Sequence, residues 1–414
     1  MGASSGASAD PGDAAGRLAR LIGAQRPGHA LSREFYCDAE VYEHERRTLL
    51  ARHWHCVGHA SQAAEPGDYY TVECCGEPLL VVRGADRELR AFYNVCRHRG
   101  SRVCTAAAGH AEGGVFVCPY HAWSYGLDGR LRGARHMPAG FERGAYGLKS
   151  VHTRVIEGVV FVSFAAEPLG LRHVEEALAA SARPYGWARA RVAHRETYGI
   201  AANWKLAVEN YMECYHCGPA HVEYSRHHLY ARPAELNAEA DARVRRRTRE
   251  LGVAVGDVDR WGFKAEAGEE SADSVRSALA EGAVSGSEDG GPVAPLMGEF
   301  PDYDGGVTFF DVGATANFLA YPDHGLIYRF SPRGVRSTEM EVIWLVRGDA
   351  RPGADYDLER LTWLWRVTSI ADKRIIELNQ QGIDSHAYEP GPYAPMEQHT
   401  RRYVEWLLAE LRAG

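Results

Sequence analysis

The stretch CRHRGSRVCTAAAGHAEGGVFVCPYH, residues 96–121, carries two Cys/His pairs. Cys96 stands two residues before His98, and Cys118 stands three residues before His121. Nineteen residues separate the two pairs. Two thiolates and two imidazoles in two short loops form a donor set that binds metal. This stretch therefore predicts a metal centre between two loops.

The order of the ligands distinguishes between the centres that use this donor set. A Cys2His2 zinc finger has CxxC followed by HxxxH, whereas this chain has CxH and then CxxH. A Rieske [2Fe-2S] cluster takes two cysteines on one iron and two histidines on the other, and it fits this order. Zinc, or cysteines that are merely buried, are the alternatives in a chain with nine cysteines. We expect the Rieske cluster, and hence electron transfer through the protein.

The residues around these ligands resemble one kind of Rieske protein. Respiratory Rieske proteins have an additional cysteine in each ligand loop, and the two form a disulfide. Ser101 and Tyr120 stand at those places in this chain. Together with the run CPYHAWSYGLDGRL at 118–131, they make the segment similar to the lower-potential Rieske domain of bacterial oxygenases.

Length and composition indicate a globular protein of ordinary type. With 414 residues, the chain exceeds what one hydrophobic core usually covers, so two domains are expected. A net charge of -8 argues against a nucleic-acid partner, because such a partner requires a basic surface. The most basic stretch, RVRRRTRE at 243–250, has acidic flanks and is predicted to be a solvated helix face.

Neither a membrane span nor a signal peptide is expected. The most apolar stretch, VIEGVVFVSFAA at 155–166, is shorter than the roughly 18 residues of a span and is interpreted as a buried strand. The opening MGASSGASADPGDAAG has no basic start and no apolar core. We predict a disordered tail and lead-in segment over residues 1–32. The odd number of cysteines agrees with a cytoplasmic protein in a reducing compartment.

Strand and helix signals divide the rest of the chain into two parts. Between 33 and 165, short β-branched and aromatic runs alternate with Gly, Pro and Asp, as in a small antiparallel β domain. From 166 to 414 the pattern is mixed, with strands expected at 307–347 and long helices at 355–381 and 396–412. The predicted class is therefore α+β, with an all-β N-terminal domain and a C-terminal domain of helices and antiparallel sheet.

A second group of reactive side chains lies in NWKLAVENYMECYHCGPAH, residues 203–221. We predict a helix over its first part. Glu209, Glu213 and His216 then stand at i, i+4 and i+7 and share one face of that helix.

Gly218 and Pro219 are expected to break this helix and to turn His221 back toward His216. Two histidines and one carboxylate that leave positions open form the facial triad of non-haem Fe(II) oxygenases. Each histidine alone is equally well interpreted as a core residue. The neighbouring carboxylates and the Rieske-type loops in the same chain favour a second iron site.

The two constellations together resemble one family. The chain is identified as a member of the Rieske non-haem iron oxygenases, as an α subunit of the ring-hydroxylating oxygenase type, over everything after residue 33. The resemblance implies two ligand sets: Cys96, His98, Cys118 and His121 for the [2Fe-2S] cluster, and His216 and His221 for a mononuclear Fe(II) that uses O2. It also implies a helix-grip-like catalytic domain and a homotrimer. In that trimer, Glu213 would bridge a cluster histidine of one subunit to an iron histidine of its neighbour.

The third ligand of the mononuclear iron is expected from a distant carboxylate. The candidates are Asp349, Asp355, Asp357, Asp372, Glu377 and Asp384. The segment TSIADKRIIELNQQG at 368–382 resembles the family's C-terminal pattern, in which an aspartate ahead of an NQxG element is the ligand. We therefore choose Asp372. The family more often has Glu-Asp here, and Ala371 departs from that pattern without changing the ligand.

Three segments, at 282–298, 344–365 and 379–398, are similar to the branch of the family that demethylates glycine betaine and proline betaine (stachydrine). That resemblance implies oxidative N-demethylation of a small quaternary or tertiary amine. An aromatic cage is one way to hold a cationic methyl group. The aromatic residues available in the catalytic half include Trp261, Phe309, Phe310, Tyr321 and Tyr328.

Two other functions stay open. Arginines and histidines of 222–250 suit a carboxylate or a larger natural product, so hydroxylation of an aromatic or natural-product substrate is one alternative. A Rieske-type electron-transfer protein is the other, but it would need only the first domain and would contain two irons rather than three. The chain has no GxGxxG fingerprint after a strand. A separate flavin and iron–sulfur reductase, with or without a ferredoxin, is therefore expected to deliver electrons from NAD(P)H.

Overall fold

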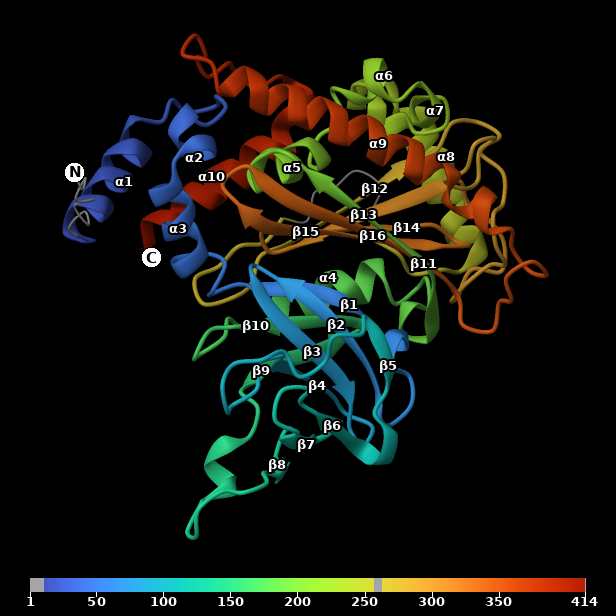
Figure 1. The fold of residues 1–414 in the computed structure, drawn as a ribbon. Helices are drawn as coiled ribbons and strands as arrows, with labels where there is room; N and C mark the ends of the chain where they lie inside the picture. The colour runs from blue at the N-terminus through green and yellow to red at the C-terminus, as the bar shows by residue number, and fades with distance from the viewer. Residues whose placement is uncertain (1–10, 257–262, 414) are drawn as a thin grey trace.

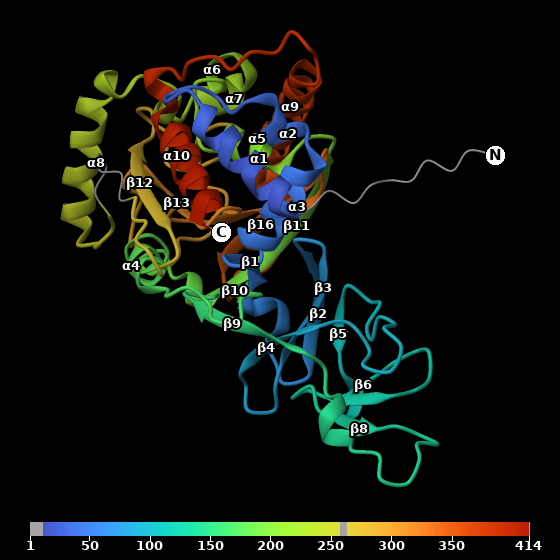
Figure 2. The same ribbon diagram turned by 90° about the vertical axis from the view of Figure 1, so that its left-hand side faces the viewer.

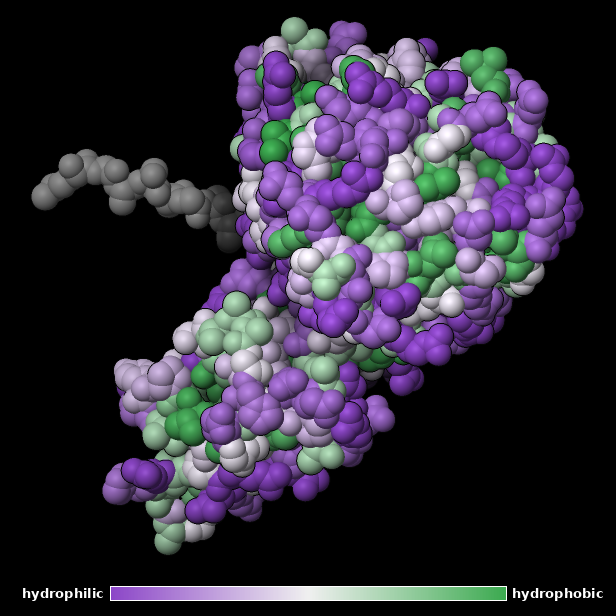
Figure 3. Space-filling view, turned by 90° about the vertical axis from the view of Figure 1, so that its right-hand side faces the viewer, coloured by the Kyte–Doolittle hydropathy of each residue, from purple (hydrophilic) through white to green (hydrophobic). Residues whose placement is uncertain are grey.

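The structure is a computed structural model that describes residues 11–256 and 263–413. The chain forms a larger part, in which long helices cover a sheet, and a smaller β part below it (Figure 1). Figure 2 shows the same two parts turned by a right angle. In the space-filling view, the smaller part projects from the larger one as a separate lobe, with hydrophobic residues gathered on its flank (Figure 3).

The smaller part is all-β, as expected. Its seven-stranded sheet has the order β1-β10-β9-β4-β3-β2-β5, and a three-stranded sheet has the order β6-β7-β8. The strands are β1 (Trp54–His59), β2 (Asp68–Cys74), β3 (Glu77–Arg83), β4 (Leu89–Tyr93), β5 (Ala108–His110), β6 (Val115–Val117), β7 (Ser124–Gly126), β8 (Leu131–Gly133), β9 (Ser150–Ile156) and β10 (Val159–Ser163). The β6-β7-β8 sheet lies at the end farthest from the larger part (Figure 1).

The larger part is built on one six-stranded antiparallel sheet of order β11-β16-β15-β14-β13-β12. Its strands are β11 (Ala190–Ile200), β12 (Ala272–Ala278), β13 (Gly306–Val312), β14 (Ala316–Ala320), β15 (Gly325–Gly334) and β16 (Ser337–Arg347). Alternate residues of a strand point to opposite faces. On β16, Val342 and Trp344 therefore join one core, while Ile343 and Leu345 join another.

Helices cover the sheet face that carries Trp344. The long helix α9 (Leu358–Ile383) crosses this face beside α5 (Trp204–Tyr211) and α10 (Gln398–Ala413) (Figure 1). The other face packs on α4 (Arg172–Ser181) and on strands β1 and β10 of the smaller part. This arrangement confirms the predicted α+β class, with a β domain followed by a domain of helices and antiparallel sheet.

The N-terminal segment differs from the prediction. Residues expected to be a disordered tail form the helix α1 (Pro11–Ala24), whose Leu18 and Ile22 are buried. Two apolar side chains at i and i+4 give this helix one face to bury, although its opening lacks an apolar core. Residues 1–10 lie outside the part of the chain that the structure describes.

The segment from residue 33 onward was expected to open the β domain, but its helices α2 (Arg33–Cys37) and α3 (Ala39–Thr48) lie beside α9 and α10 in Figures 1 and 2. The buried Glu45 of α3 accepts hydrogen bonds from Lys205 Nζ of α5 at 2.7 and 2.8 Å. A buried charge is stable only when it is paired in this way. These helices therefore fold with the larger part.

Three further helices connect β11 to β12: α6 (Cys217–Ala220), α7 (Val222–Ser225) and α8 (Ala238–Leu251). The basic stretch 243–250 falls within α8, as predicted for a helix. Within the described ranges, no helix has both the length and the apolar character that crossing a bilayer demands.

Candidate metal centres and substrate pocket

The two predicted cluster loops share one backbone design. In each loop, the cysteine N–H donates to the carbonyl five residues later, and the N–H four residues later donates to the cysteine carbonyl, at 2.8–3.0 Å. The fourth residue has positive φ in both loops, 79° at Gly100 and 56° at Ala122. Cys96 and Cys118 thus begin two closed loops of the same shape.

The donor atoms of these loops are arranged by exposure. Cys96 and Cys118 are buried, whereas His98 and His121 are exposed. The two imidazole rings lie 4.6 Å apart between centroids, and His98 stacks on Trp123 at 4.8 Å. Two inner thiols and two outer imidazoles are the donor set of a Rieske cluster, so the residues present fit that group.

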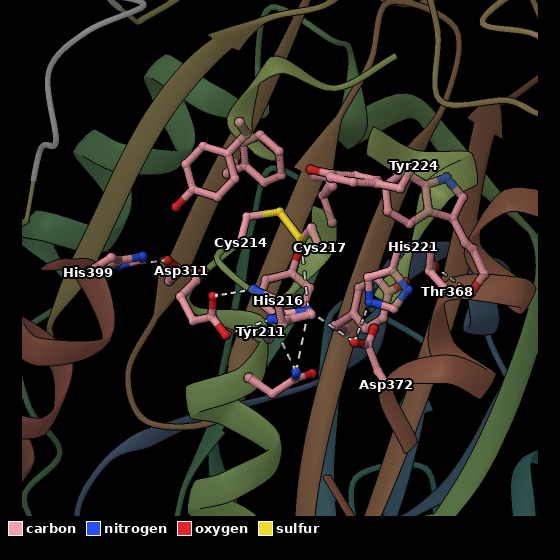
Figure 4. A pocket seen from close by; sticks show the side chains of 17 residues that line it. Tyr211, Cys214, His216, Cys217, His221, Tyr224, Asp311, Thr368, Asp372 and His399 are labelled. Atoms are coloured by element: carbon pink, nitrogen blue, oxygen red, sulfur yellow. Dashed lines mark hydrogen bonds and ion pairs between the residues drawn. A yellow bond between two sulfur atoms is a disulfide. The ribbon is translucent and has the colours of Figure 1, made fainter. Parts of the chain in front are cut away.

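The second predicted site comes together from three separate segments (Figure 4). His221 Nε2 lies 2.8 Å and His216 Nε2 lies 3.3 Å from the same oxygen of Asp372. The ligand atoms of all three residues lie within 4.8 Å of one another. Two imidazoles and one carboxylate around one point, beside an open pocket, fit a mononuclear non-haem iron.

The local path of the chain differs from the predicted helix. The helix α5 begins after Asn203, whose side chain accepts from the Lys205 N–H, and it ends at Tyr211. His216 precedes α6 and His221 follows it. Pro219 lies inside α6 rather than breaking a helix, because proline is tolerated in the first turn, where its missing N–H leaves no bond unmade.

Glu209 and Glu213 consequently do not share a helix face. Glu209 accepts from the Tyr36 hydroxyl at 2.9 Å, away from the histidines. Glu213 lies in the turn after α5, and its Oε1 is 2.6 Å from His216 Nδ1. Its other oxygen accepts from the N–H groups of Tyr215 and His216. Glu213 therefore fixes both the backbone and the ring of His216.

The electrostatics of the three metal-binding candidates depend on their mutual contacts. Burial lowers the pKa of His216, but hydrogen bonds to Asp372 and Glu213 outweigh it and raise that pKa to about 9. Burial would raise the pKa of Asp372, but hydrogen bonds with His216 and His221 hold it below its usual value. Asp372 is thus a carboxylate, the form that binds metal.

The other carboxylates considered for the third ligand have different partners. Asp357 caps the N-terminus of α9. The remaining ones form ion pairs: Asp349 with Arg347, Asp355 with Arg351, Glu377 with Lys373 and Asp384 with Arg336. Among the six, Asp372 is the one that the structure brings to His216 and His221.

One feature of this segment was missed. Cys214 and Cys217 form a disulfide around Tyr215 and His216, whereas the odd number of cysteines favoured a reducing compartment, in which disulfides are rare. The CxxC spacing was the available signal. The disulfide closes the turn that carries His216, and both of its cysteines also line the pocket (Figure 4).

The pocket beside the three metal-binding candidates is lined largely by aromatic rings. Its aromatic walls are Tyr211, Tyr224, Tyr230, Phe309, Tyr328 and Trp365. The space between these walls, counted together with the open mouth of the pocket, is about 630 Å³.

The aromatic residues proposed from the sequence divide into three groups. Phe309 and Tyr328 line the pocket. Phe310 packs in the core on the other sheet face, and Tyr321 hydrogen bonds His228 at 2.7 Å outside the pocket wall. Trp261 lies outside the described residues.

Acidic groups also reach the pocket wall. Asp311 of β13 lies 3.4 Å from His399 Nε2, which is 3.0 Å from Asp273. Burial raises the pKa of Asp311 to about 6. Burial would lower the pKa of His399, but the carboxylates of Asp273 and Asp311 raise it above its ordinary value. Two carboxyl groups thus flank the His399 ring and favour its protonated form.

Comparisons with known families agree with both centres. Residues 53–152 match the Rieske [2Fe-2S] domain. Residues 187–413 match the family described as ring hydroxylating alpha subunit (catalytic domain). The two matches cover the β part and the larger part of the structure in turn.

Curated relatives match most of the chain. The glycine betaine monooxygenase oxygenase subunit of Chromohalobacter salexigens is 36% identical over 395 residues, which are 92% of this chain and 86% of that protein. The subunit of the same name from Pseudomonas aeruginosa PAO1 is 34% identical over 91% of this chain and 88% of its own. The carnitine monooxygenase oxygenase subunit of Escherichia coli K12 is 41% identical over 46% of this chain and 52% of its own.

Solved structures share the fold. The quaternary ammonium Rieske monooxygenase CntA, in complex with an inhibitor, superposes with a TM-score of 0.72 at 23% identity and covers 94% of this chain and 97% of its own. Naphthalene 1,2-dioxygenase with bound indole gives 0.65 at 18% identity, over 93% and 92%. The chain therefore belongs to the ring-hydroxylating oxygenase α subunits, Rieske non-haem iron enzymes that combine a [2Fe-2S] cluster with mononuclear iron and receive electrons from a separate reductase.

Proposed function

We propose that this oxygenase removes a methyl group from a small quaternary or tertiary amine. The observation that carries the proposal is the composition of the pocket wall. Six aromatic rings and three carboxylates, those of Glu213, Asp311 and Asp372, line it, and the described lining contains no lysine or arginine. Aromatic faces and carboxylates attract a cationic methylammonium group.

The named relatives support the same class of substrate. Two of the relatives above are named for glycine betaine, and another is named for carnitine. A solved structure of CntA is described as a complex with L-carnitine. The buried His399 gives the wall one positive charge beside Asp311, which suits the carboxylate of a betaine.

The reaction is an oxidative demethylation that consumes O2 and two electrons. One oxygen atom enters a methyl C–H bond, and the other leaves as water with the two electrons and two protons. The resulting hemiaminal breaks at its C–N bond and gives formaldehyde, the shortened amine and, from a quaternary amine, a proton. Two electrons per turnover therefore must come from the reductase.

The chain's own residues divide this work between two sites. When bound, the cluster supplies electrons and the mononuclear iron supplies oxygen activation. We propose Cys96, His98, Cys118 and His121 as the cluster ligands, and His216, His221 and Asp372 as the iron ligands. The aromatic walls then hold the substrate so that one methyl group faces the histidines and water is excluded.

We further propose a homotrimer in which electrons cross between subunits. Within one chain, the cluster loops flank β6, at the far end of the β part, whereas α6, which His216 precedes, lies at the top of the larger part (Figure 1). The exposed rings of His98 and His121 suit contact with another subunit. A structural study of CntA describes inter-subunit electron transfer in that enzyme. Glu213 is our proposed bridge at the receiving end.

The reductase is proposed to carry flavin and an iron–sulfur centre, with electrons from NAD(P)H. We also propose a cytoplasmic location, because NAD(P)H-linked reductases operate there and seven of the nine cysteines lie outside disulfides. Purification of an active complex from the soluble fraction, with NADH oxidation dependent on both components, tests this pairing.

Hydroxylation of a flat aromatic substrate is the second candidate. The aromatic walls also suit a neutral ring, and the large component of naphthalene 1,2-dioxygenase from Pseudomonas fluorescens is 34% identical over 46% of this chain. The acidic groups of the pocket distinguish the two functions, because the carboxylate of Asp311 attracts a cationic amine but does not attract a neutral aromatic ring.

The deciding experiment measures O2 uptake and formaldehyde together. Glycine betaine, proline betaine, carnitine and several aromatic acids are supplied to the reductase-coupled enzyme. The proposal expects one formaldehyde per O2 from at least one amine. Tert-butylacetate, in which carbon replaces the nitrogen of glycine betaine, is the matched control and should neither bind nor react. Hydroxylated aromatic product without formaldehyde from any amine would overturn the demethylation proposal.

A further inference from the structure

A cluster of three ligand-type side chains lies where the β part meets the larger part, away from both iron centres. It consists of His55 in β1, Cys74 at the end of β2 and Cys75 in the following turn, and all three are buried. Their donor atoms lie within 4.8 Å of one another. Cys75 Sγ is 3.6 Å from each ring nitrogen of His55 and 4.0 Å from Cys74 Sγ. Zinc bonds of about 2.0–2.3 Å place two ligand atoms no more than about 4.6 Å apart, so these donors nearly converge on one ion.

The backbone at Cys75 is unfavourable for cysteine. Cys75 and Gly76 form the two-residue turn between β2 and β3, with φ values of 52° and 86°. Turns with positive φ at both positions favour Asn, Asp or Gly. The chain instead places a cysteine there and buries its thiol against His55. A side chain held in such a conformation points to a use for that side chain.

His55 is oriented as a metal-binding histidine is. Its Nε2 lies 2.6 Å from the carbonyl oxygen of Leu50 and must donate its N–H there. Nδ1 is then the ring nitrogen left to bind a metal, and it lies 3.1 Å from Thr315 Oγ1. The Cys75 thiol lies over the ring, at 3.6 Å from each nitrogen, so an ion that joins them requires a small rotation of the ring or the thiol. Donation of one ring N–H to a carbonyl, which leaves the other nitrogen without a proton, is the usual second contact of a histidine ligand.

A divalent cation would balance the charge that the ligands carry in their metal-binding form, with both thiols deprotonated. Two thiolates and a neutral imidazole carry a charge of about −2, which is costly to bury unless it is matched. Arg329 lies beside the cysteines, with Nη2 3.4 Å from the carbonyl oxygen of Glu73. The charge of Arg329 is already paired with the carboxylate of Glu341. A divalent ion would make the set of ligands neutral.

We propose that His55, Cys74 and Cys75 bind a zinc ion, with the Thr315 hydroxyl beside His55 Nδ1 as a candidate for the fourth position. Soft thiolate ligands and a nitrogen select zinc over the harder divalent cations. His55 and the cysteines belong to the β part, whereas Thr315 stands between β13 and β14 of the larger part. The ion would therefore fasten the two parts of the chain together, and its role is structural.

The test measures zinc and iron in the same purified holoenzyme. The protein is produced in medium that contains both metals, and zinc and iron are quantified per chain by mass spectrometry. Wild type should contain one zinc in addition to the iron of both centres. Cys75→Gly should retain its iron and its cluster spectrum but lose zinc by more than about tenfold. Glycine suits the positive φ at this position, so the variant relieves the turn and keeps the fold.

Two controls separate this site from other sources of zinc. Cys37→Ser removes a thiol outside the cluster and should leave zinc unchanged, as should Asp372→Ala, which alters the mononuclear site. Zinc X-ray absorption of the wild type should show two sulfur ligands and one nitrogen ligand. Zinc that persists in Cys75→Gly, zinc that disappears in Asp372→Ala, or a wild type that binds no zinc would each overturn the proposal. A Cys74–Cys75 disulfide in the purified protein would also overturn it.

Discussion

The Nδ1 atom of His216 lies 2.6 Å from a carboxylate oxygen of Glu213. Since this contact occupies one ring nitrogen, Nε2 is left to face Asp372 and the mononuclear iron that we propose there. A carboxylate on the distal nitrogen of a metal-binding histidine fixes its tautomer and raises its basicity. The side chain of Glu213 is 12% exposed, so it also has an edge that another subunit can reach.

Replacing Glu213 should therefore affect electron transfer more than metal binding. Glu213→Gln keeps a similar shape, and we expect both the cluster and the mononuclear iron to remain. Steady-state turnover should fall by roughly 100-fold, at the upper end of losses at such positions. In rapid-mixing experiments, the reduced cluster should stay reduced in the presence of substrate and O2.

Glu223→Gln, in the neighbouring helix α7, is the matched control and should turn over normally. Normal turnover in Glu213→Gln as well would remove Glu213 from the electron path. Loss of iron in Glu213→Gln would instead assign it a role in holding the site.

Asp372→Ala should remove the mononuclear iron and spare the cluster. Two histidines alone offer too few protein ligands to retain Fe(II) well. We expect iron to fall from three to two atoms per chain while the visible spectrum of the cluster is unchanged. Glu377→Ala, on the same helix α9, removes a carboxylate that pairs with Lys373 and should keep all three irons. Full iron occupancy in Asp372→Ala would move the third ligand elsewhere.

The two ligand sets show what a sequence reveals about a site. Cys96, His98, Cys118 and His121 lie in two short loops, so their spacing alone indicates how they meet. His216 and His221 are also close in sequence. Asp372 lies on a helix far along the chain, and the residues alone left six carboxylates open. Only the resemblance singled it out, because spacing carries no information on tertiary approach.

The walls of the pocket were harder to predict for the same reason. Phe309 and Phe310 are neighbours on β13, yet they point to opposite faces of the sheet, and only Phe309 lines the pocket. Tyr224 lies on α7 and Trp365 lies on α9, and these two helices come together only in the folded chain. Choosing among such residues requires the strand register and the placement of the helices.

Secondary structure was missed where tertiary pairing overrides local preference. The strand β12 reads ADSVRSA, small and polar residues with a weak strand signal. It forms because every residue from Ala272 to Ala278 pairs with β13, and its Arg276 is buried against Asp304. The helix predicted through His216 ended at Tyr211, because the turn that follows is held by Glu213 and by the Cys214–Cys217 disulfide.

Stability should depend on pH through the buried His53. Burial lowers its pKa, but Glu270 and Glu410 outweigh burial and raise it to about 9. A histidine whose pKa is raised in the folded state contributes stability that is complete below its unfolded pKa of about 6.5 and is lost as the pH rises through about 9. The rise in the pKa of His53 from 6.5 to about 9 corresponds to roughly 3 kcal/mol of folding free energy.

The unfolding temperature of the wild type should therefore fall between pH 6.5 and 9 more steeply than that of His53→Gln, as measured by differential scanning fluorimetry. His29, which is partly exposed and whose Nδ1 lies 3.0 Å from the Pro27 carbonyl oxygen, provides the control variant His29→Gln. Parallel curves for wild type and His53→Gln would show that His53 keeps one protonation state over this range.

Binding of a cationic amine should weaken as the pH falls through the pKa of Asp311. Burial raises this pKa to about 6, so the carboxyl group becomes neutral at a pH where an exposed aspartate stays charged. Asp273 and Asp311 raise the pKa of His399 above its ordinary value, so His399 retains its proton at the acidic pH values at which Asp311 becomes neutral. The pocket therefore loses one negative charge and keeps its positive one. If binding requires the ionised form, Kd for the amine should be about tenfold higher at pH 5 than at pH 7.5.

Calorimetry under anaerobic conditions measures the Kd of the amine at both pH values directly. Asp311→Asn should bind the amine weakly at every pH, with a flat profile, and a neutral aromatic ligand should bind the wild type equally at both values. An amine affinity that is independent of pH in the wild type would show that Asp311 does not face the bound cation.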